Sequence, residues 1–268
     1  MILLLVIGIL STLIIQSIPS LKQFGLIGFY FSSVWDSREG MENYGALTFI
    51  AGSVLTAFLA LLIALPFSMS LVIFNEAYVQ GKGFEKPMNI IIDIATTIPS
   101  IIWGVWGFHV VRPLLSALNI GNQGYGILCT SIVLALMIIP YAASYATIFI
   151  RNIPIQLKEN AYSLGATGME VIWKVNLPYA GKGIISSHLL ALGRAFGEAI
   201  VVVILIGNSY IFPSGLFDTG NTMSSILINQ GGSASDLQLS AIFAIALFLF
   251  LLTAGINILA KYLISKTS

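Results

Sequence analysis

The chain has 268 residues, of which 57% are hydrophobic and only 9% are charged, and its mean hydropathy is +0.94. A soluble domain is usually about a quarter charged, so this composition excludes an ordinary soluble protein and indicates one embedded in a membrane. The net charge of +1 gives no support to nucleic-acid binding. The single cysteine, Cys129, has no partner for a disulfide, which also excludes a thiolate metal site.

Long apolar segments dominate the chain. A helix that crosses a hydrocarbon core of about 30 Å needs about 20 mainly apolar residues. Six segments meet that length, which predicts an all-α, polytopic membrane protein with six transmembrane helices. Pro66, Pro99 and Pro140 fall inside three of them, so kinked helices that pack on one another are expected. The segments are approximately 1–18, 45–74, 88–111, 124–150, 183–207 and 238–260.

The first segment begins at Met1 with no basic stretch, and Ser17-Ile18-Pro19-Ser20 is a poor match to a cleavage site, so an uncleaved first helix is expected. The positions of the 12 Lys and Arg residues then predict the orientation. Most of them lie in the second and fourth loops and the C-terminal tail, which places both termini in the cytoplasm by the positive-inside rule. These eight are Lys82, Lys86, Arg151, Lys158, Lys174, Lys182, Lys261 and Lys266.

The third segment contains the run ATTIPSIIWGVWG, Ala95 to Gly107. Small and hydroxylated residues let membrane helices approach closely and form hydrogen bonds across their interface. Plain helix packing is therefore the favoured interpretation of this run.

The longest cytoplasmic connection, residues 151–182, has paired signals for helix starts and ends. Pro154 suits the first turn of a helix, and Gly165 suits the turn just past a helix end. Thr167 and Glu170 then have the spacing of a capping box, so a second helix should run to about Asn176 before Pro178 stops it. The loop is expected to be a short helix, a sharp turn and another helix.

This loop also resembles the EAA motif of ABC-importer permeases. Asn160 and Val175 depart mildly from the motif, which has Ala and Ile at these positions. The resemblance implies that the loop contains a coupling helix, which docks into a cleft of an ATP-hydrolysing subunit. The alternative is an interfacial amphipathic helix with no partner. The residues that match are Glu159, Ala161, Gly165, Leu177 and Pro178.

Three longer stretches resemble the permeases of phosphate ABC importers, and the PstC-type subunit more than its PstA-type sister. They are Phe29 to Glu76, IPSIIWGVWG from Ile98, and GRAFGEAIVVVILIGN from Gly193. The resemblance covers roughly residues 29–261. Sulfate and molybdate permeases share the loop and a related Arg-Ala-x-Gly-Glu string, so these two oxyanions stay open as substrates.

The resemblance implies a type I ABC-importer permease fold. It implies one transmembrane permease domain over residues 1–268, with a permease core at 45–265. The implied partners are a PstA-type sister permease, two PstB-type ATP-binding subunits and an extracytoplasmic PstS-type phosphate-binding protein. No cofactor is expected. The chain has no G-x-x-x-x-G-K-[ST] motif, so ATP hydrolysis is expected in another subunit and this chain is not expected to be an enzyme.

Arg194 and Glu198 are the candidate residues of the substrate pathway. An Arg inside a membrane span usually faces a protein interior or a water-filled path, and its planar fork of donors matches a tetrahedral oxyanion. Glu198 is expected one helical turn later on the same face, where it neutralises Arg194 when no anion is bound. An internal salt bridge that locks helix packing is the alternative, which Gly193 and Gly197 support.

Four other polar residues fall in or near the spans. His188 is expected to pack against or bond a neighbouring helix, and Asp93 to reach the cytoplasmic interface. His109 and Arg112, at the outer end of the third segment, are candidates for attracting an incoming anion.

Two other classes of protein have less support from the sequence. An ion-gradient carrier would use Arg194 and Glu198 as a proton relay, but no internal repeat is visible. A membrane-embedded enzyme would need a cluster of His, Cys or paired carboxylate side chains. This chain has too few such residues to form one.

Overall fold

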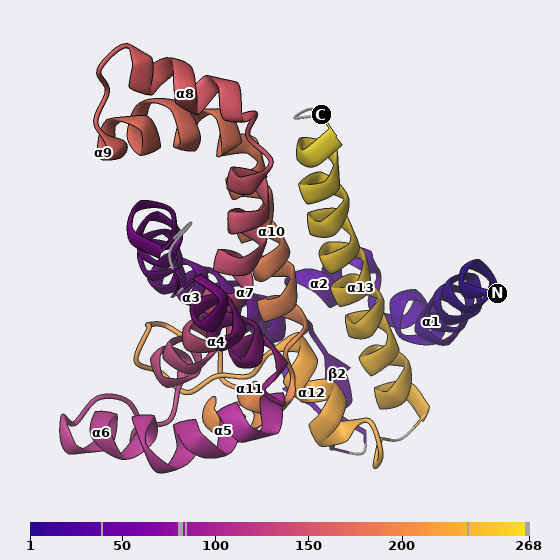
Figure 1. Ribbon diagram of the computed structural model, residues 1–268. Helices are drawn as coiled ribbons and strands as arrows, with labels where there is room; N and C mark the ends of the chain where they lie inside the picture. The colour runs from indigo at the N-terminus through magenta and orange to yellow at the C-terminus, as the bar shows by residue number, and fades with distance from the viewer. Residues whose placement is uncertain (39, 80–82, 84, 235, 266–268) are drawn as a thin grey trace. The chain divides into compact units, whose positions relative to one another are not determined.

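The computed structural model describes residues 1–38, 40–79, 83, 85–234 and 236–265. Helices dominate this part of the chain (Figure 1), and the all-α prediction is confirmed. The strands are β1 (Trp35–Asp36) and β2 (Asn43–Tyr44), which pair antiparallel with Trp35 opposite Tyr44. The helices are α1 (Ile2–Phe24), α2 (Leu26–Phe31), α3 (Leu47–Phe74), α4 (Glu85–Thr97), α5 (Ser100–His109), α6 (Val111–Ala117), α7 (Ile127–Arg151), α8 (Ile155–Ser163), α9 (Gly168–Val171), α10 (Leu177–Gly197), α11 (Ile200–Leu205), α12 (Met223–Gln230) and α13 (Asp236–Ser265), with π-helical turns η1 (Asn75–Val79) and η2 (Ile172–Asn176).

Four helical stretches in the described chain are long and apolar enough to cross a membrane, and a fifth is added if one broken pair counts as a single span. The broken pair is Lys86–Thr97 with Ser100–Ala117. The sequence predicted six spans. The one predicted at 183–207 is divided between α10 and α11, and α10 itself carries polar residues such as His188 and Arg194. The four unbroken stretches are Leu3–Phe24, Leu47–Tyr78, Ile127–Arg151 and Asp236–Ser265.

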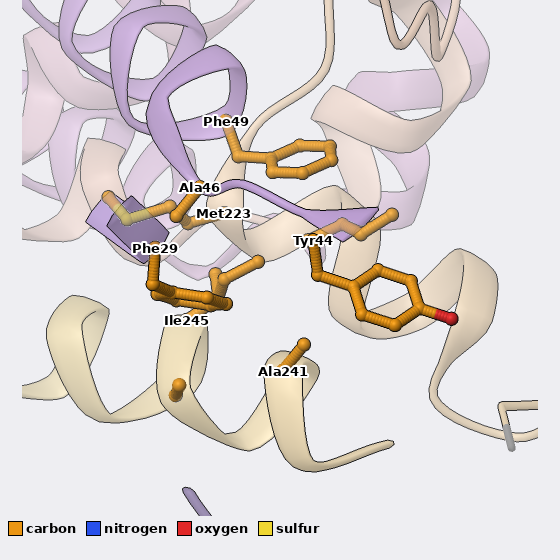
Figure 2. Close-up of a cluster of buried hydrophobic side chains, with 9 residues drawn as sticks. Phe29, Tyr44, Ala46, Phe49, Met223, Ala241 and Ile245 are labelled. Carbon is orange, nitrogen blue, oxygen red and sulfur yellow. The ribbon is translucent and has the colours of Figure 1, made fainter. Parts of the chain in front are cut away.

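Residues 1–59, 100–133 and 196–254 form one compact unit. Figure 2 shows its apolar core, in which side chains from α2 and β2 are directed toward α13. The indole of Trp35 lies 4.9 Å from the ring centroids of both Tyr44 and Phe49, so the small hairpin covers this core. Cys129 is also buried in this unit, on α7. The core residues are Phe29, Tyr44, Ala46, Phe49, Met223, Ile226, Ala241, Ala244 and Ile245.

Two glycines let α5 lie close to its neighbours in this unit. A Cβ at Gly104 would lie 2.7 Å from Ile204 Cδ1, and one at Gly107 would lie 2.6 Å from Val133 Cγ2. Any larger residue would push these backbones apart. The expectation that the run Ala95 to Gly107 serves helix packing is confirmed for these two positions.

The described residues of 60–99, 134–195 and 255–268 form a second compact unit. Its apolar core joins α3, α7 and α10, and α8 and α9 form a hairpin beyond the end of α7 and the start of α10 (Figure 1). Leu177, which belongs to the predicted motif, packs against this core. The buried core residues are Val72, Ala143, Ala146, Ile150, Ile153, Ala180 and Ile184.

The prolines in the predicted spans have two different effects. Pro66 and Pro140 lie inside α3 and α7, which continue past them. Pro99 instead lies in the two-residue gap between α4 and α5. Proline lacks a backbone N–H and its ring clashes with the preceding turn, so an interruption at such a residue is expected.

Candidate functional site

The predicted loop is a helical hairpin whose turn is built on Gly165. This residue follows α8 with φ +86°, a conformation that glycine adopts without steric cost. The Gly165 N–H donates to the Tyr162 carbonyl at 2.9 Å, and the Ala166 N–H donates to the Ala161 carbonyl at 3.1 Å. These two bonds define a Schellman motif, which satisfies carbonyls that the end of α8 would leave unpaired. The predicted sharp turn is confirmed.

The second arm of the hairpin begins with the predicted capping box. The Thr167 N–H donates to Glu170 Oε2 at 3.0 Å, and the Glu170 N–H donates to Thr167 Oγ1 at 3.4 Å. Lys174 Nζ, one turn later, donates to Glu170 Oε1 at 2.9 Å. The backbone bond from Thr167, followed by the contacts with Lys174 and the Thr167 hydroxyl, lowers the pKa of Glu170 to about 2. The carboxylate therefore stays ionised, and α9 stays capped, at neutral pH.

Pro178 does not stop the second helix, so this expectation is wrong. The chain runs from α9 through η2 directly into α10, with Pro178 in the first turn of α10. The ring of a proline in a helix clashes with the carbonyl four residues earlier, here that of Lys174. That carbonyl lies in the wider π turn η2, which removes the clash and lets the helical path continue.

The hairpin presents large apolar side chains to its surroundings. Leu164, beside the turn, is 90% exposed, and Trp173 on η2 is 58% exposed. None of the residues of α8 is buried, and Glu159 is exposed on this helix. Exposed apolar groups such as these are typical of a surface that another protein covers.

A buried carboxylate joins the hairpin to the end of α3. Glu76 on η1 accepts hydrogen bonds from Lys158 Nζ at 2.6 Å and from Asn176 Nδ2 at 2.9 Å, both at Oε1. The Glu76 and Lys158 side chains are only 8% and 12% exposed. Neither Glu76 nor Asn176 is predicted as a functional residue from the sequence. These contacts join residues 82 and 100 positions apart, so no local pattern indicates them.

An open cleft of about 530 Å³ lies beside this contact. Glu76 and Lys158 line it together with residues of both arms of the hairpin, among them Ile155, Met169 and Ile172. Side chains therefore do not fill the space between η1 and the hairpin at this place.

Arg194 lies in the last turn of α10 and is half-buried. Its guanidinium carbon lies 5.1 Å from the ring centroid of Tyr141 on α7. Its Nε is buried and has no hydrogen-bond partner within the described residues. A cation–π contact contributes about 0.5–2 kcal/mol, whereas a charged side chain at the bilayer centre costs about 2.5–3.5 kcal/mol on insertion scales. The aromatic ring therefore offsets only part of the cost, and the Nε donor is left without a partner in the described chain.

Glu198 is not on the same helix as Arg194, so the expected spacing of one helical turn on one face is wrong. The helix α10 ends at Gly197, and Glu198 and Ala199 lie in a break before α11. The Glu198 carbonyl accepts a hydrogen bond from Ser224 Oγ of α12 at 2.8 Å, which satisfies one backbone group exposed by the break. Irregular backbone at membrane depth is tolerated where protein buries it or where it lines a cavity.

The glycines beside this pair differ in their surroundings. A Cβ at Gly193 would lie 2.9 Å from Asn257 Oδ1, so Gly193 allows close packing with α13. A Cβ at Gly197 would meet nothing within 4 Å in the described chain.

The other polar residues lie apart from these features or have structural partners. His188 Nε2 lies 2.8 Å from Ser68 Oγ on α3, which confirms that it bonds a neighbouring helix. The guanidinium carbon of Arg112 lies 4.7 and 4.3 Å from the ring centroids of Phe108 and Tyr125, so it connects α6 with the loop that follows it. His109 and Asp93 are exposed. Of the basic residues used for orientation, Lys82 and Lys266 lie outside the described residues.

No three His, Cys, Asp or Glu side chains gather as a metal site would require within the part of the chain that the structure describes.

Comparison with known proteins gives consistent similarities. Residues 77–268 match the family described as binding-protein-dependent transport system inner membrane component. The chain is 36% identical over 278 residues to the phosphate transport system permease protein PstC of Haemophilus influenzae, covering 97% of this chain and 87% of that protein. It is 34% identical over 278 residues to the probable PstC of Methanocaldococcus jannaschii, covering 96% and 87%.

Two solved structures are similar in fold. The first is the inward-facing MetNI methionine ABC transporter, with a TM-score of 0.58 and 18% identity over 84% of this chain and 94% of that chain. The second is a bacterial alginate ABC transporter, with a TM-score of 0.63 and 18% identity over 98% and 91%.

Proposed function

This chain belongs to the family of binding-protein-dependent transport system inner membrane components, and from that membership we propose that it is the permease subunit of an ATP-driven importer of inorganic phosphate. The predicted ABC-importer permease fold is confirmed by the likeness to transporter structures, and the chain is a multi-pass membrane protein. The phosphate substrate is proposed because the relatives at 36% and 34% identity are phosphate permeases.

The α8–α9 hairpin is proposed as the element that an ATP-hydrolysing subunit binds. The observation that carries this proposal is the Schellman turn at Gly165, which places the exposed apolar side chain of Leu164 at the tip of the hairpin. Glu159 and Pro178 are exposed and available to a partner, whereas Ala161 and Leu177 support the hairpin from within. ATP hydrolysis then takes place in the partner, and this chain carries out no covalent step.

Arg194 and Glu198 are proposed to contact the anion during its passage. The guanidinium is permanently charged and has a buried Nε without a hydrogen-bond partner in the described chain, which suits a tetrahedral oxyanion. Glu198, in the break between α10 and α11, supplies a carboxylate that accepts a hydrogen bond from a protonated phosphate. Alternating access would expose this path first outward and then inward.

The assembly is proposed to contain a PstA-type sister permease, two PstB-type ATP-binding subunits and an extracytoplasmic PstS-type binding protein. Residues 45–265 of the single permease domain are proposed as the core that pairs with the sister permease. The basic residues of the hairpin and the C-terminal tail support an orientation in the cytoplasmic membrane with both termini in the cytoplasm.

Anion uptake into vesicles that contain the whole complex tests the proposal. We expect ATP-dependent uptake of labelled phosphate that unlabelled phosphate blocks and that equal sulfate or molybdate leaves nearly unchanged. Arg194→Gln should lower uptake by about tenfold or more, because a hydrogen bond to a charged group is worth about 1.5–3 kcal/mol. Arg38→Gln, which changes an exposed arginine of the β1–β2 hairpin, is the matched control.

Stronger competition by sulfate or molybdate would reassign the substrate to that oxyanion. Uptake that survives without ATP and collapses when an ionophore removes the proton gradient would replace the importer with an ion-gradient carrier.

A further inference from the structure

The contact centred on Glu76 brings together three segments that are distant in sequence. Glu76 follows α3 directly, Lys158 lies on the hairpin arm before the Gly165 turn, and Asn176 lies at the end of the arm after it. Both arms donate to the same carboxylate oxygen, at 2.6 and 2.9 Å. A single atom therefore links the membrane helix α3 to each half of the hairpin. We call Glu76, Lys158 and Asn176 the Glu76 tie.

Stability alone does not explain a buried ion pair here. Removing two charges from water carries a large desolvation cost, and apolar residues of similar volume often stabilise a fold equally well. Val72 and Leu177 already take part in an apolar cluster that holds the base of the hairpin against α3. A charged contact differs from that cluster because it fixes one geometry, and such contacts are best attested as devices that set register.

The local backbone gives the tie a mechanical role. Glu76 lies on the π turn η1, and Asn176 ends the π turn η2. π turns are rare, occur mainly as single turns within α-helices and are frequent at functional sites. Without the tie, only the apolar cluster at the base of the hairpin would link it to α3, and a displacement of the arms could be absorbed in η1 and η2.

The open cleft strengthens this conclusion. A space of about 530 Å³ lies between η1 and the hairpin, and the side chains of the described residues do not fill it, so they do not transmit force across it. Glu76 and Lys158 both line that space, and their ion pair connects η1 with the hairpin there.

We propose that the Glu76 tie transmits the displacement of the α8–α9 hairpin to α3, and that Glu76 is thereby a positioning residue for coupling ATP hydrolysis to transport. This inference rests on the proposed function, because it requires an ATP-hydrolysing partner that moves the hairpin. The tie acts at a distance from the anion and contacts no substrate.

The test measures phosphate taken up per ATP hydrolysed, in vesicles that contain the whole complex. Glu76→Gln keeps the side-chain volume and an acceptor for Asn176 but removes the charge, and Lys158→Met removes the charge of the partner. In both variants we expect ATP hydrolysis to continue while uptake per ATP falls roughly fivefold or more, the lower range for coupling between sites. The double variant Glu76→Lys, Lys158→Glu should regain part of the ratio. Asp36→Asn, which breaks an exposed ion pair of the β1–β2 hairpin, should leave the ratio unchanged.

A merely structural role predicts a different result. Uptake and hydrolysis would then fall together, in proportion to the amount of assembled complex, and an unchanged ratio in Glu76→Gln and Lys158→Met would overturn the proposal. If these variants do not assemble, Asn176→Leu gives the same test, since it keeps the ion pair and releases only the second arm.

A different result would show that the proposed function itself is wrong. Wild-type vesicles that take up no phosphate would reject phosphate import. In that case the role of the tie can still be tested by measuring how strongly added binding protein stimulates ATP hydrolysis. The same stimulation in Glu76→Gln as in the wild type would overturn the proposal about the tie.

Discussion

The turn at Gly165 allows the role of the hairpin to be tested with a single methyl group. A Cβ at this position would meet no atom within 4 Å, so alanine fits the available space. The obstacle is the backbone, which has φ +86°. A left-handed conformation costs an L-residue roughly 1–2 kcal/mol, whereas asparagine tolerates it better.

This cost can be compared with the bonds that hold the turn. The two Schellman hydrogen bonds, from the Gly165 and Ala166 amides, contribute about 0.5–1.5 kcal/mol each. The strain in Gly165→Ala is therefore similar to what the turn can supply, and the equilibrium constant between the formed and the open turn should fall about 5- to 30-fold. Gly165→Asn should lie between alanine and the wild type.

The assay is hydrogen exchange at the Ala166 amide, together with titration of the ATP-hydrolysing subunit onto the permease. Exchange should accelerate by up to that factor, and apparent affinity should weaken in proportion to the fraction of the turn that is still formed. Gly181→Ala is the control, because Gly181 lies within α10 with no positive φ and no atom near a new Cβ. If Gly165→Ala behaved like Gly181→Ala in both measurements, the argument from backbone strain would be refuted.

Two further predictions concern packing and charge. Gly107→Ala places a Cβ 2.6 Å from Val133 Cγ2, and such overpacking should lower stability by about 1–3 kcal/mol, seen as a lower thermal unfolding midpoint in detergent. Gly255→Ala, whose Cβ would meet nothing within 4 Å, should not show this loss, and equal midpoints would contradict the packing. The lowered pKa of Glu170 means that its contribution to the α9 cap is complete above its ordinary value of 4.5 and is lost as pH falls toward about 2. A carboxyl-carbon NMR titration of Glu170 with a midpoint near 4.5 would exclude this cap.

The hairpin could be predicted from sequence because its signals are local. A left-handed turn that favours glycine, as at Gly165, and a capping box spanning Thr167 to Glu170 each depend on residues within one or two helical turns. The same reasoning failed at Pro178, because the wider turn that accommodates its ring has no comparable sequence signal. A proline is a reliable stop only where the preceding turn is regular.

The features that arise from distant contacts could not be predicted. The Glu76 tie joins residues 82 and 100 positions apart, and its carboxylate lies at the end of a long apolar run. The break at Glu198 depends on a hydrogen bond from Ser224, in a helix that follows a long loop. Hydropathy finds apolar length, so it predicted one continuous span across residues that the fold divides.

Cys129 is the only cysteine of the chain, and it is 1% exposed. Maleimides and other thiol reagents need an accessible thiolate, so the native side chain will not compete for them. A cysteine placed at Leu164, which is 90% exposed at the tip of the hairpin, can therefore carry a fluorophore in a chain that needs no other alteration. Turnover of the assembled transporter can then be followed as a change in the fluorescence of a label at this one position.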